Sequence, residues 1–252
     1  MASNAARLLR PSERVSVQGR EVKNRLLRGI PDNEFRIVRA RLEFVKLPHH
    51  VVLHKPKSRV PYVYFLNEGM ISLVVECGDG RKVEVAVVGT EGASGIPAMV
   101  KLRTSPLQEI IQISGSGFRI GAAALQDCLR FAPQFRERLH RYVVLQTMQI
   151  AQTAACNRLH EIRERLARWL LMTQDRVPSA FLPITHDFLA EMLGTDRPTV
   201  TLAAGMLQKK GAIQYVRGAV RIVSRKALRR ETCECYMAME QFNADLGLNL
   251  PA

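Results

Sequence analysis

The amino-acid sequence predicts an α+β protein that runs from an antiparallel, strand-rich domain through one long helix to a winged helix-turn-helix. Three observations support this prediction. Short runs typical of strands occupy residues 43–120, helical periodicity occupies residues 125–172, and a hairpin pattern returns after residue 211. The chain has 252 residues, which is long enough for two domains that each bury a core.

Residues 1–25 are polar and basic, and we expect them to form a flexible arm. They lack the apolar core of a secretory signal, and no apolar run approaches the roughly 20 residues that span a bilayer. The five cysteines are odd in number and scattered along the chain, unlike a disulfide framework. We therefore expect a cytoplasmic protein without membrane contacts.

A short helical pattern between Leu26 and Leu42 precedes the strands. Runs rich in β-branched and aromatic residues then predict strands at residues 43–47, 51–53, 62–66, 70–75, 83–88, 109–113 and 118–120. Asp79-Gly80 predicts a hairpin turn, because glycine supplies positive φ without strain. Asn67-Glu68-Gly69 predicts the turn before it. Strands at this spacing indicate a compact antiparallel barrel or sandwich that ends near residue 120.

Strand character stops after residue 120, and helical periodicity extends to Met172 with Pro133 as its only breaker. The helix predicted over residues 131–158 has an apolar face too wide for contact with one domain. The face includes Leu139, Val143, Leu145, Met148, Ile150, Ala154, Ala155 and Leu159. We expect this helix to contact both its own sheet domain and a symmetry partner, as a dimerisation helix does.

Residues 185–211 carry the signals of two helices joined by a tight turn. Thr185 can cap the first helix, and Gly194 fits the left-handed conformation of the turn. Asp196 or Thr195 can cap the second helix, whose first turn contains Pro198. Two β-like runs around Arg217-Gly218 then predict a wing. The local signals agree on a winged helix-turn-helix.

The second helix and the wing predict a DNA-binding surface, since the N-terminal part of a recognition helix reads bases in the major groove. Nine Lys and Arg and no Asp or Glu lie between Arg197 and Arg230, and the whole chain carries a formal charge of +14. Arg197 can bind guanine in a bidentate manner. The predicted DNA-binding residues are Thr185, Thr195, Asp196, Arg197, Thr199, Thr201, Leu202, Lys209, Arg217 and Arg221.

In its order of parts, the chain resembles the Crp/Fnr family of transcription regulators. The most specific stretches are residues 182–211, the hairpins of residues 62–89 and the helix around residues 161–171. The resemblance implies a jelly-roll-like β-roll sensor, a homodimer and binding to palindromic promoter DNA, with RNA polymerase as a further candidate partner. It divides the chain into an arm (1–25), a β-roll (26–130), a dimerisation helix (131–158), a winged domain (159–230) and a tail (231–252).

The effector pocket implied by the resemblance departs from the pattern of cyclic AMP binders. Those relatives carry a Gly-Glu-Leu phosphate cassette followed by Arg-Ser, whereas this chain has Gly95-Ile96-Pro97 and only Arg103-Thr104 as a weak substitute. The long helix offers Ile150-Ala151 where cyclic AMP binders present hydroxyls. The candidate pocket residues are Gly95, Ile96, Arg103, Thr104, Ile150 and Ala151, and we expect an effector other than cyclic AMP, if there is one.

The sequence predicts no cofactor, no metal site and no enzymatic activity. Residues 1–76 contain no cysteine for an iron–sulfur cluster. His49, His50 and His54 lie in the first strands, where histidines without a functional role are commoner than haem ligands. Cys233 and Cys235 form a C-x-C pair, but a metal needs more ligands than their sequence neighbours supply. An alternative to DNA binding is a ligand sensor that uses the basic wing to bind a protein partner.

Overall fold

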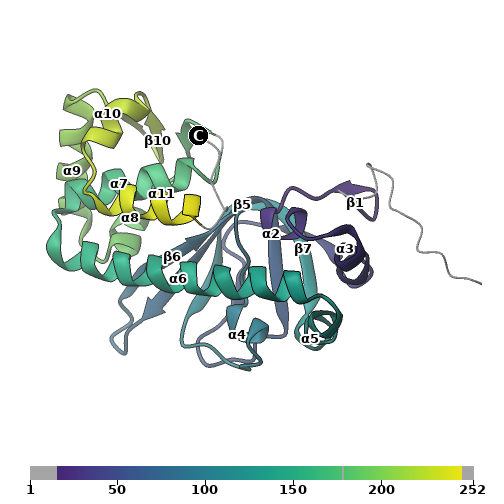
Figure 1. Cartoon of the computed structure of the whole chain (residues 1–252). Coiled ribbons are helices and arrows are strands. Elements are labelled where there is room, and N and C mark those ends of the chain that lie inside the picture. The colour runs from purple at the N-terminus through teal and green to yellow at the C-terminus, as the bar shows by residue number, and fades with distance from the viewer. Residues whose placement is uncertain (1–15, 178, 246–252) are drawn as a thin grey trace, which may run out of the picture.

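The computed structural model describes residues 16–177 and 179–245. Figure 1 shows a β-sheet domain and a mainly helical C-terminal domain that both contact the long helix α6 (Pro133–Leu159). The mixed α+β class and this order of parts confirm the fold class expected from the sequence. Within the described residues, no helix is long and apolar enough to cross a membrane.

Five antiparallel strands form the main sheet of the N-terminal domain. They are β3 (Glu43–Leu47), β4 (Val52–His54), β5 (Tyr62–Glu76), β6 (Lys82–Val88) and β7 (Gln108–Gly121). The order is β3-β7-β5-β6, and β4 also pairs with β7. Apolar side chains form buried clusters that join the sheet to α2 (Arg25–Arg28), α3 (Asp32–Arg39), α5 (Ala122–Phe131) and α6.

The expectation of a turn at Asn67-Glu68-Gly69 was wrong. These residues lie inside β5, where the register against β7 shifts several times, as in a β-bulge. Gly69 has φ +89°, and a Cβ there would lie 2.5 Å from the carbonyl oxygen of Ile113. The glycine therefore permits a bulge in close contact with β7, and not a chain reversal. The hairpin at Asp79-Gly80 is present, with Gly80 at φ +83°.

Part of the segment expected as a flexible arm over residues 1–25 is folded. Residues 1–15 lie outside the described part of the chain, but residues 16–24 contain β1 (Ser16–Val17) and β2 (Arg20–Glu21), which pair with each other. Val17 and Val22 are buried in the core next to α2. Val17 and Val22 are five residues apart, a spacing that does not match the two-residue period of a strand.

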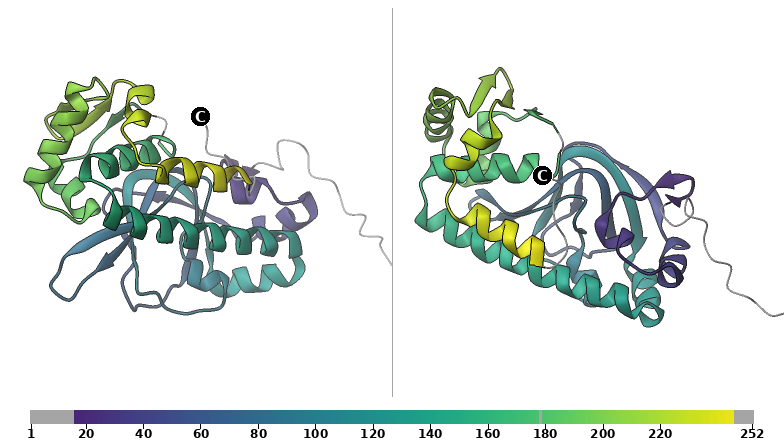
Figure 2. Two further views of the ribbon diagram at one scale, coloured as in Figure 1. Left: turned by 60° about the vertical axis from the view of Figure 1, so that its left-hand side comes forward. Right: turned by 45° about the horizontal axis from the view of Figure 1, so that its top comes forward.

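The C-terminal domain begins with α7 (Ile162–Gln174), which starts with a capping box between Glu161 and Glu164. It continues through β8 (Phe181–Leu182), α8 (His186–Leu193), α9 (Arg197–Lys209), β9 (Ile213–Val216), β10 (Ala219–Ile222) and α10 (Arg225–Arg230). The segment expected as a tail contains another helix, α11 (Cys235–Asp245), which lies along α6 (Figure 2). Tyr236 and Met239 anchor α11 because both are buried.

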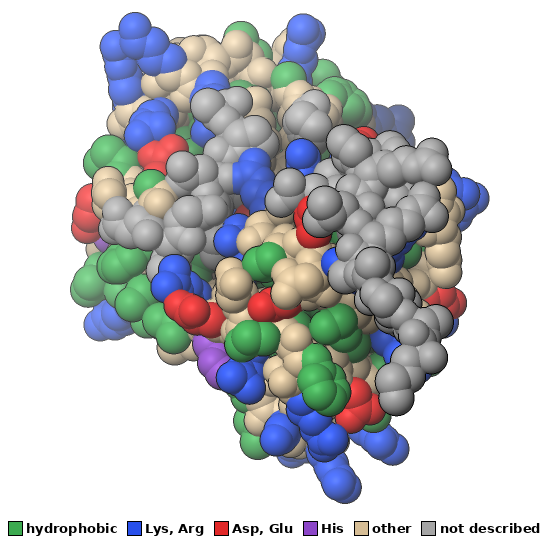
Figure 3. Space-filling view, turned by 45° about the vertical axis from the view of Figure 1, so that its right-hand side comes forward, with side chains coloured by type: hydrophobic (Ala, Val, Ile, Leu, Met, Phe, Trp, Pro, Cys, Tyr) green, Lys and Arg blue, Asp and Glu red, His purple; other side chains and the backbone are tan. Residues whose placement is uncertain are grey.

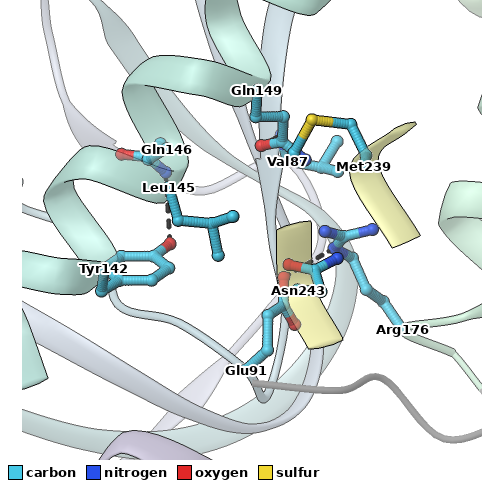
Figure 4. A pocket seen from close by; sticks show the side chains of 9 residues that line it. All are labelled: Val87, Glu91, Tyr142, Leu145, Gln146, Gln149, Arg176, Met239 and Asn243. Atoms are coloured by element: carbon cyan, nitrogen blue, oxygen red, sulfur yellow. Dashed lines mark hydrogen bonds and ion pairs between the residues drawn. The ribbon is translucent and has the colours of Figure 1, made fainter. Parts of the chain in front are cut away.

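Buried polar contacts join the two domains. Trp169 Nε1 donates a hydrogen bond to Glu84 at 2.7 Å, and Arg176 Nε pairs with Glu91 at 2.8 Å. Figure 4 shows the Glu91–Arg176 pair beside Met239 of α11, around a cavity of about 10 Å³. That volume holds about one water molecule, so the cavity is a packing feature and not a ligand pocket.

Candidate nucleic-acid interface

Side-chain caps define the turn between α8 and α9. The Thr185 hydroxyl accepts a hydrogen bond from the Phe188 amide at 3.2 Å and caps α8. Gly194 ends α8 with φ +61°, which is the left-handed conformation expected from the sequence. Asp196 caps α9 by accepting from the Thr199 amide at 2.8 Å. The two caps fix the angle at which α9 leaves the turn.

Some side chains on the outward face of α9 form hydrogen bonds within the protein, whereas others are available to a partner. The Thr201 hydroxyl donates to the Arg197 carbonyl at 2.9 Å and lies 3.0 Å from His186 Nδ1. Thr199 Oγ1 donates to Asp196 at 2.9 Å. Arg197 is exposed, with only a loose ion pair of 3.5 Å to Asp187. Arg197 is therefore the polar side chain of this face that is most available to a base edge.

Two apolar side chains also project from α9. Leu202 is 67 % exposed, in keeping with its predicted place on the outer face. Met206, one turn later, is also exposed and was not among the residues predicted from the sequence. Its spacing of four residues from Leu202 was the signal that could have identified it. Exposed apolar groups on such a helix suit the thymine methyl group.

The wing also supplies exposed cations. β9 and β10 pair in register through Ala219 and Val216, and the turn between them contains Arg217 and Gly218, whose φ is +77°. Lys209, Arg217 and Arg221 are exposed, and their side chains have no ion pair or hydrogen bond with any residue of the described chain. Free cations of this kind are suited to phosphate contacts.

Other basic residues of the segment stabilise the fold. Arg225 pairs with buried Asp175 at 2.5 Å, Arg229 pairs with Glu240 at 2.6 Å, and Lys210 pairs with Glu231 at 2.8 Å. The run of nine cations in the sequence therefore divides into structural and free members. Lys and Arg side chains project at the upper and lower ends of the face in Figure 3. The positive charge alone does not locate the DNA-binding surface.

A cleft of about 860 Å³ separates the β5–β6 hairpin from the start of α9. Arg197 and Asp196 line one wall, and Val83 and Lys82 line the other. Lys82 Nζ lies 3.8 Å from Glu191, so the hairpin contacts α8 directly. The turn at Gly194, which precedes α9, also lies against Val83 of the sheet domain.

The segment at Gly95, which corresponds to the phosphate cassette of cyclic AMP binders, is occupied by a side chain of the protein itself. The Gly95 amide donates to both carboxylate oxygens of Glu109, at 3.1 and 3.2 Å, and the Ser94 hydroxyl also donates to Glu109. Burial raises the pKa of Glu109 to about 6, and His54 Nε2 lies 3.5 Å away. A carboxylate therefore takes the hydrogen bonds that an anionic ligand would need.

The other predicted pocket residues occupy different environments. Ile96 lies half-buried at the start of α4 (Ile96–Met99), and Thr104 pairs with Arg59 as an isolated bridge next to exposed Arg103. Ile150 packs against the apolar cluster of the sheet, whereas its neighbour Ala151 is exposed. The structure thus gives the six residues no common environment.

The family comparison concerns the segment whose geometry is described above. Residues 164–231 match the model of the Crp-like helix-turn-helix domain. This segment is a Crp-like helix-turn-helix domain. The match runs from α7 through the wing to the end of α10, so it includes both capped helices. No curated protein is similar enough in sequence to be matched to the chain.

Solved structures extend the similarity to the sheet domain. FixK2 from Bradyrhizobium japonicum superposes with a TM-score of 0.66 at 15% identity, over 76% of this chain and 98% of its own. The c-di-GMP-responsive regulator CLP from Xanthomonas campestris gives 0.63 at 15%, over 77% and 100%. A CRP-family transcriptional regulator from Thermus thermophilus gives 0.62 at 20%, over 74% and 95%. The chain has the Crp/Fnr fold, with a Crp-like domain at its C-terminal end.

Proposed function

We propose that the protein is a cytoplasmic transcription regulator that binds palindromic DNA as a homodimer, with RNA polymerase as a candidate partner. The observation that supports it best is the Crp-like domain, in which α9 is capped at Asp196 and presents exposed Arg197 and Leu202. Further free cations are Lys209 at the end of α9 and Arg217 and Arg221 in the wing. Arg197 and Leu202 supply base contacts, and these cations contact phosphates.

A second copy of the chain is the proposed occupant of the exposed side of α6. One side of this helix packs on the sheet domain and α11, which buries Leu139 and Leu145. The opposite side exposes an apolar stripe at spacings of three and four residues: Val144, Met148, Ala151, Ala155 and Leu159. Leu159 alone is 74 % exposed. A stripe with this spacing favours helix pairing by side-chain interdigitation.

The sheet domain has the fold of a sensor, and we propose that its effector is not cyclic AMP. Support comes from Glu109, whose carboxylate already accepts from Ser94 and from the Gly95 amide. A cyclic phosphate at this position would have to displace a buried carboxylate of like charge. An effector that enters elsewhere would act by shifting the population of domain arrangements around residues 156–161.

The test is selection of bound duplexes from a random pool by the full-length chain. The proposal expects enrichment of a palindrome whose half-sites lie about one helical turn apart. A double variant, Val144→Glu with Met148→Glu, places like charges at the α6 stripe and should give monomers whose affinity for the palindrome falls by about 10²–10⁴-fold. Leu102→Glu, at an exposed position of the sheet domain, is the matched control.

Two results would overturn the proposal. Absence of duplex binding at low salt would favour a sensor that uses the wing to bind a protein. Enrichment of single, unpaired half-sites, together with a double variant whose particle mass in solution equals that of the unaltered protein, would show that α6 is not the dimer contact.

A further inference from the structure

Four side chains with metal-binding atoms meet where α6 ends. Cys156 and His160 come from the last turn of α6 and its C-cap, and Cys233 and Cys235 come from the connection between α10 and the start of α11. One ligand atom from each residue lies within 4.8 Å of the other three. The neighbours of Cys233 and Cys235 along the chain supply too few ligands for a metal, but Cys156 and His160 lie more than 70 residues earlier in the sequence.

The spacing of these atoms suits one small tetrahedral ion. Cys156 Sγ lies 3.5 Å from Cys233 Sγ, and Cys235 Sγ lies 3.6 Å from His160 Nδ1. Zinc bonds of about 2.3 Å to sulfur and about 2.0 Å to nitrogen place tetrahedral ligand atoms about 3.5–3.8 Å apart. We propose that Cys156, His160, Cys233 and Cys235 form a structural zinc site.

Neighbouring groups orient the ligands as they do around known zinc sites. His160 Nε2 lies 3.1 Å from a carboxylate oxygen of Glu234. A hydrogen bond that Nε2–H donates to this oxygen leaves Nδ1 unprotonated and free to bind the metal. Gln152 Nε2 donates to Cys235 Sγ at 3.0 Å. A hydrogen bond of this kind stabilises a thiolate more than a thiol. Both contacts therefore favour the metal-binding forms of the ligands.

The local charge also suits an anionic centre. Three thiolates and one divalent ion carry a net charge of −1. Arg168 is 5 % exposed and donates to Thr153 Oγ1, and its Nε has no hydrogen-bond partner among the described residues. Arg165 has a similarly unpartnered Nε. Two arginines beside Cys156 would offset the charge of the zinc site, as burial of an anion requires.

The ligand set distinguishes zinc from other occupants. Three thiolates and one imidazole, with no position left for water, are typical of closed structural zinc sites. A Cys156–Cys233 disulfide would require the sulfurs to approach from 3.5 to about 2.05 Å and would leave Cys235 and His160 without a role. The cysteines are free thiols in the structure.

The position of the site determines what zinc would do. The ligands join the C-terminal end of α6 to the connection that leads into α11. Glu231, two residues before Cys233, pairs with Arg163 of α7 and Lys210 next to α9. Zinc would therefore hold α7, α10 and α11 against the long helix and fix the orientation of the C-terminal domain. This role does not depend on the DNA-binding proposal.

The experiment measures metal in the full-length protein purified without chelator. We expect about one zinc per chain by inductively coupled plasma mass spectrometry. Removal of zinc with EDTA should lower the Tm, and added Zn²⁺ should restore it. Co²⁺ added to the metal-free protein should give the intense visible bands of a tetrahedral site together with thiolate charge-transfer absorption. The Co²⁺ spectrum reports ligand type directly in the unaltered chain.

Variants provide the second part of the test. Cys235→Ser and His160→Ala should each lose bound zinc and the Tm response to EDTA. Cys77→Ser, at an exposed thiol, and Cys128→Ser, at a buried thiol in the sheet domain, are matched controls that should retain both.

Three results would overturn the zinc site. The first is a metal-free chain that takes up neither Zn²⁺ nor Co²⁺. The second is an octahedral Co²⁺ spectrum without sulfur charge transfer. The third is a count of three free thiols instead of five in the denatured, metal-free protein as purified, because it would show a disulfide in place of the site.

Discussion

The backbone amides at the start of α4 and at the start of α9 donate hydrogen bonds to acceptors that lie at different distances along the chain. At α4 the Gly95 amide is bonded by Glu109, a carboxylate 14 residues away on β7, and the site is buried. At α9 the Thr199 amide is bonded by Asp196, only three residues away, and the side chains around it are exposed. A local cap leaves the helix surface free for a partner, whereas a cap from a distant strand closes it.

Among the variants considered, the strongest destabilisation should come from removing the Glu109 carboxylate at the start of α4. Glu109→Ala removes the acceptor of two buried donors, Ser94 Oγ and the Gly95 amide. Each donor left unsatisfied costs about 1–3 kcal/mol, so we expect the free energy of unfolding to fall by about 2–6 kcal/mol. Urea denaturation measures it. Glu43→Ala, which removes an exposed carboxylate paired with Arg119, should change the stability by less than about 1 kcal/mol.

The same variant tests whether Glu109 blocks anion binding at Gly95. If Glu109 is what closes the cassette, inorganic phosphate should raise the Tm of Glu109→Ala and leave that of the unaltered protein unchanged. An equal response of both proteins would show that the cassette does not depend on this carboxylate.

A second buried carboxylate links the sheet domain to the C-terminal domain. Burial raises the pKa of Glu84 to about 7. Hydrogen bonds from Ser72 and Trp169 favour the ionised form and offset part of this increase. The folded state therefore holds a proton that the unfolded state releases above about pH 4.5. Stability should fall as the pH rises from about 4.5 to 7, by at most about 1.4 kcal/mol per pH unit, and should level off above that range.

Glu84→Gln tests this dependence because glutamine resembles the protonated acid. Glu109 contributes a slope of the same sign up to about pH 6, so the relevant measurement is the difference between the two stability profiles. We expect the difference to grow in favour of the variant between pH 5 and 7. Parallel profiles would mean that Glu84 does not titrate in this range.

The sequence predicted best those features whose signals are local. The caps at Thr185 and Asp196, the turn at Gly194 and the hairpin at Gly80 each depend on residues within a few positions of one another. Consequently the helix-turn-helix was placed correctly from the sequence. The DNA contacts assigned to its residues stay predictions.

Features built from residues that are distant in the sequence were missed, because they depend on contacts that only the tertiary fold creates. The bulge at Gly69 depends on the approach of β7, and the closed cassette depends on Glu109. The four residues of the zinc site meet only because α11 folds back along α6. No spacing rule within one segment can reveal contacts that the tertiary fold creates.

At the exposed start of α9, we expect Arg197 to discriminate between DNA bases. Arg197→Ala should reduce the preference for the selected site over random duplex by about 1–3 kcal/mol, because a bidentate base contact is lost. Competition binding at fixed salt measures it. Arg130→Ala, which removes an exposed arginine of α5, should leave the preference unchanged. An unaltered preference in Arg197→Ala would place base recognition elsewhere on the surface.

The smallest effect should come from the wing. Arg217 and Arg221 are exposed cations without ion pairs in the described chain, so they can each neutralise one phosphate. Changing either one to Gln should weaken binding to all duplexes about equally and reduce the slope of log K against log salt by about 0.9 per protomer. Lys210→Gln is the contrasting control, because Lys210 is held by Glu231 and should affect the slope less. If Arg217→Gln altered sequence preference instead of the salt slope, the wing would read DNA bases, and the free cations of this domain would no longer be only electrostatic contacts.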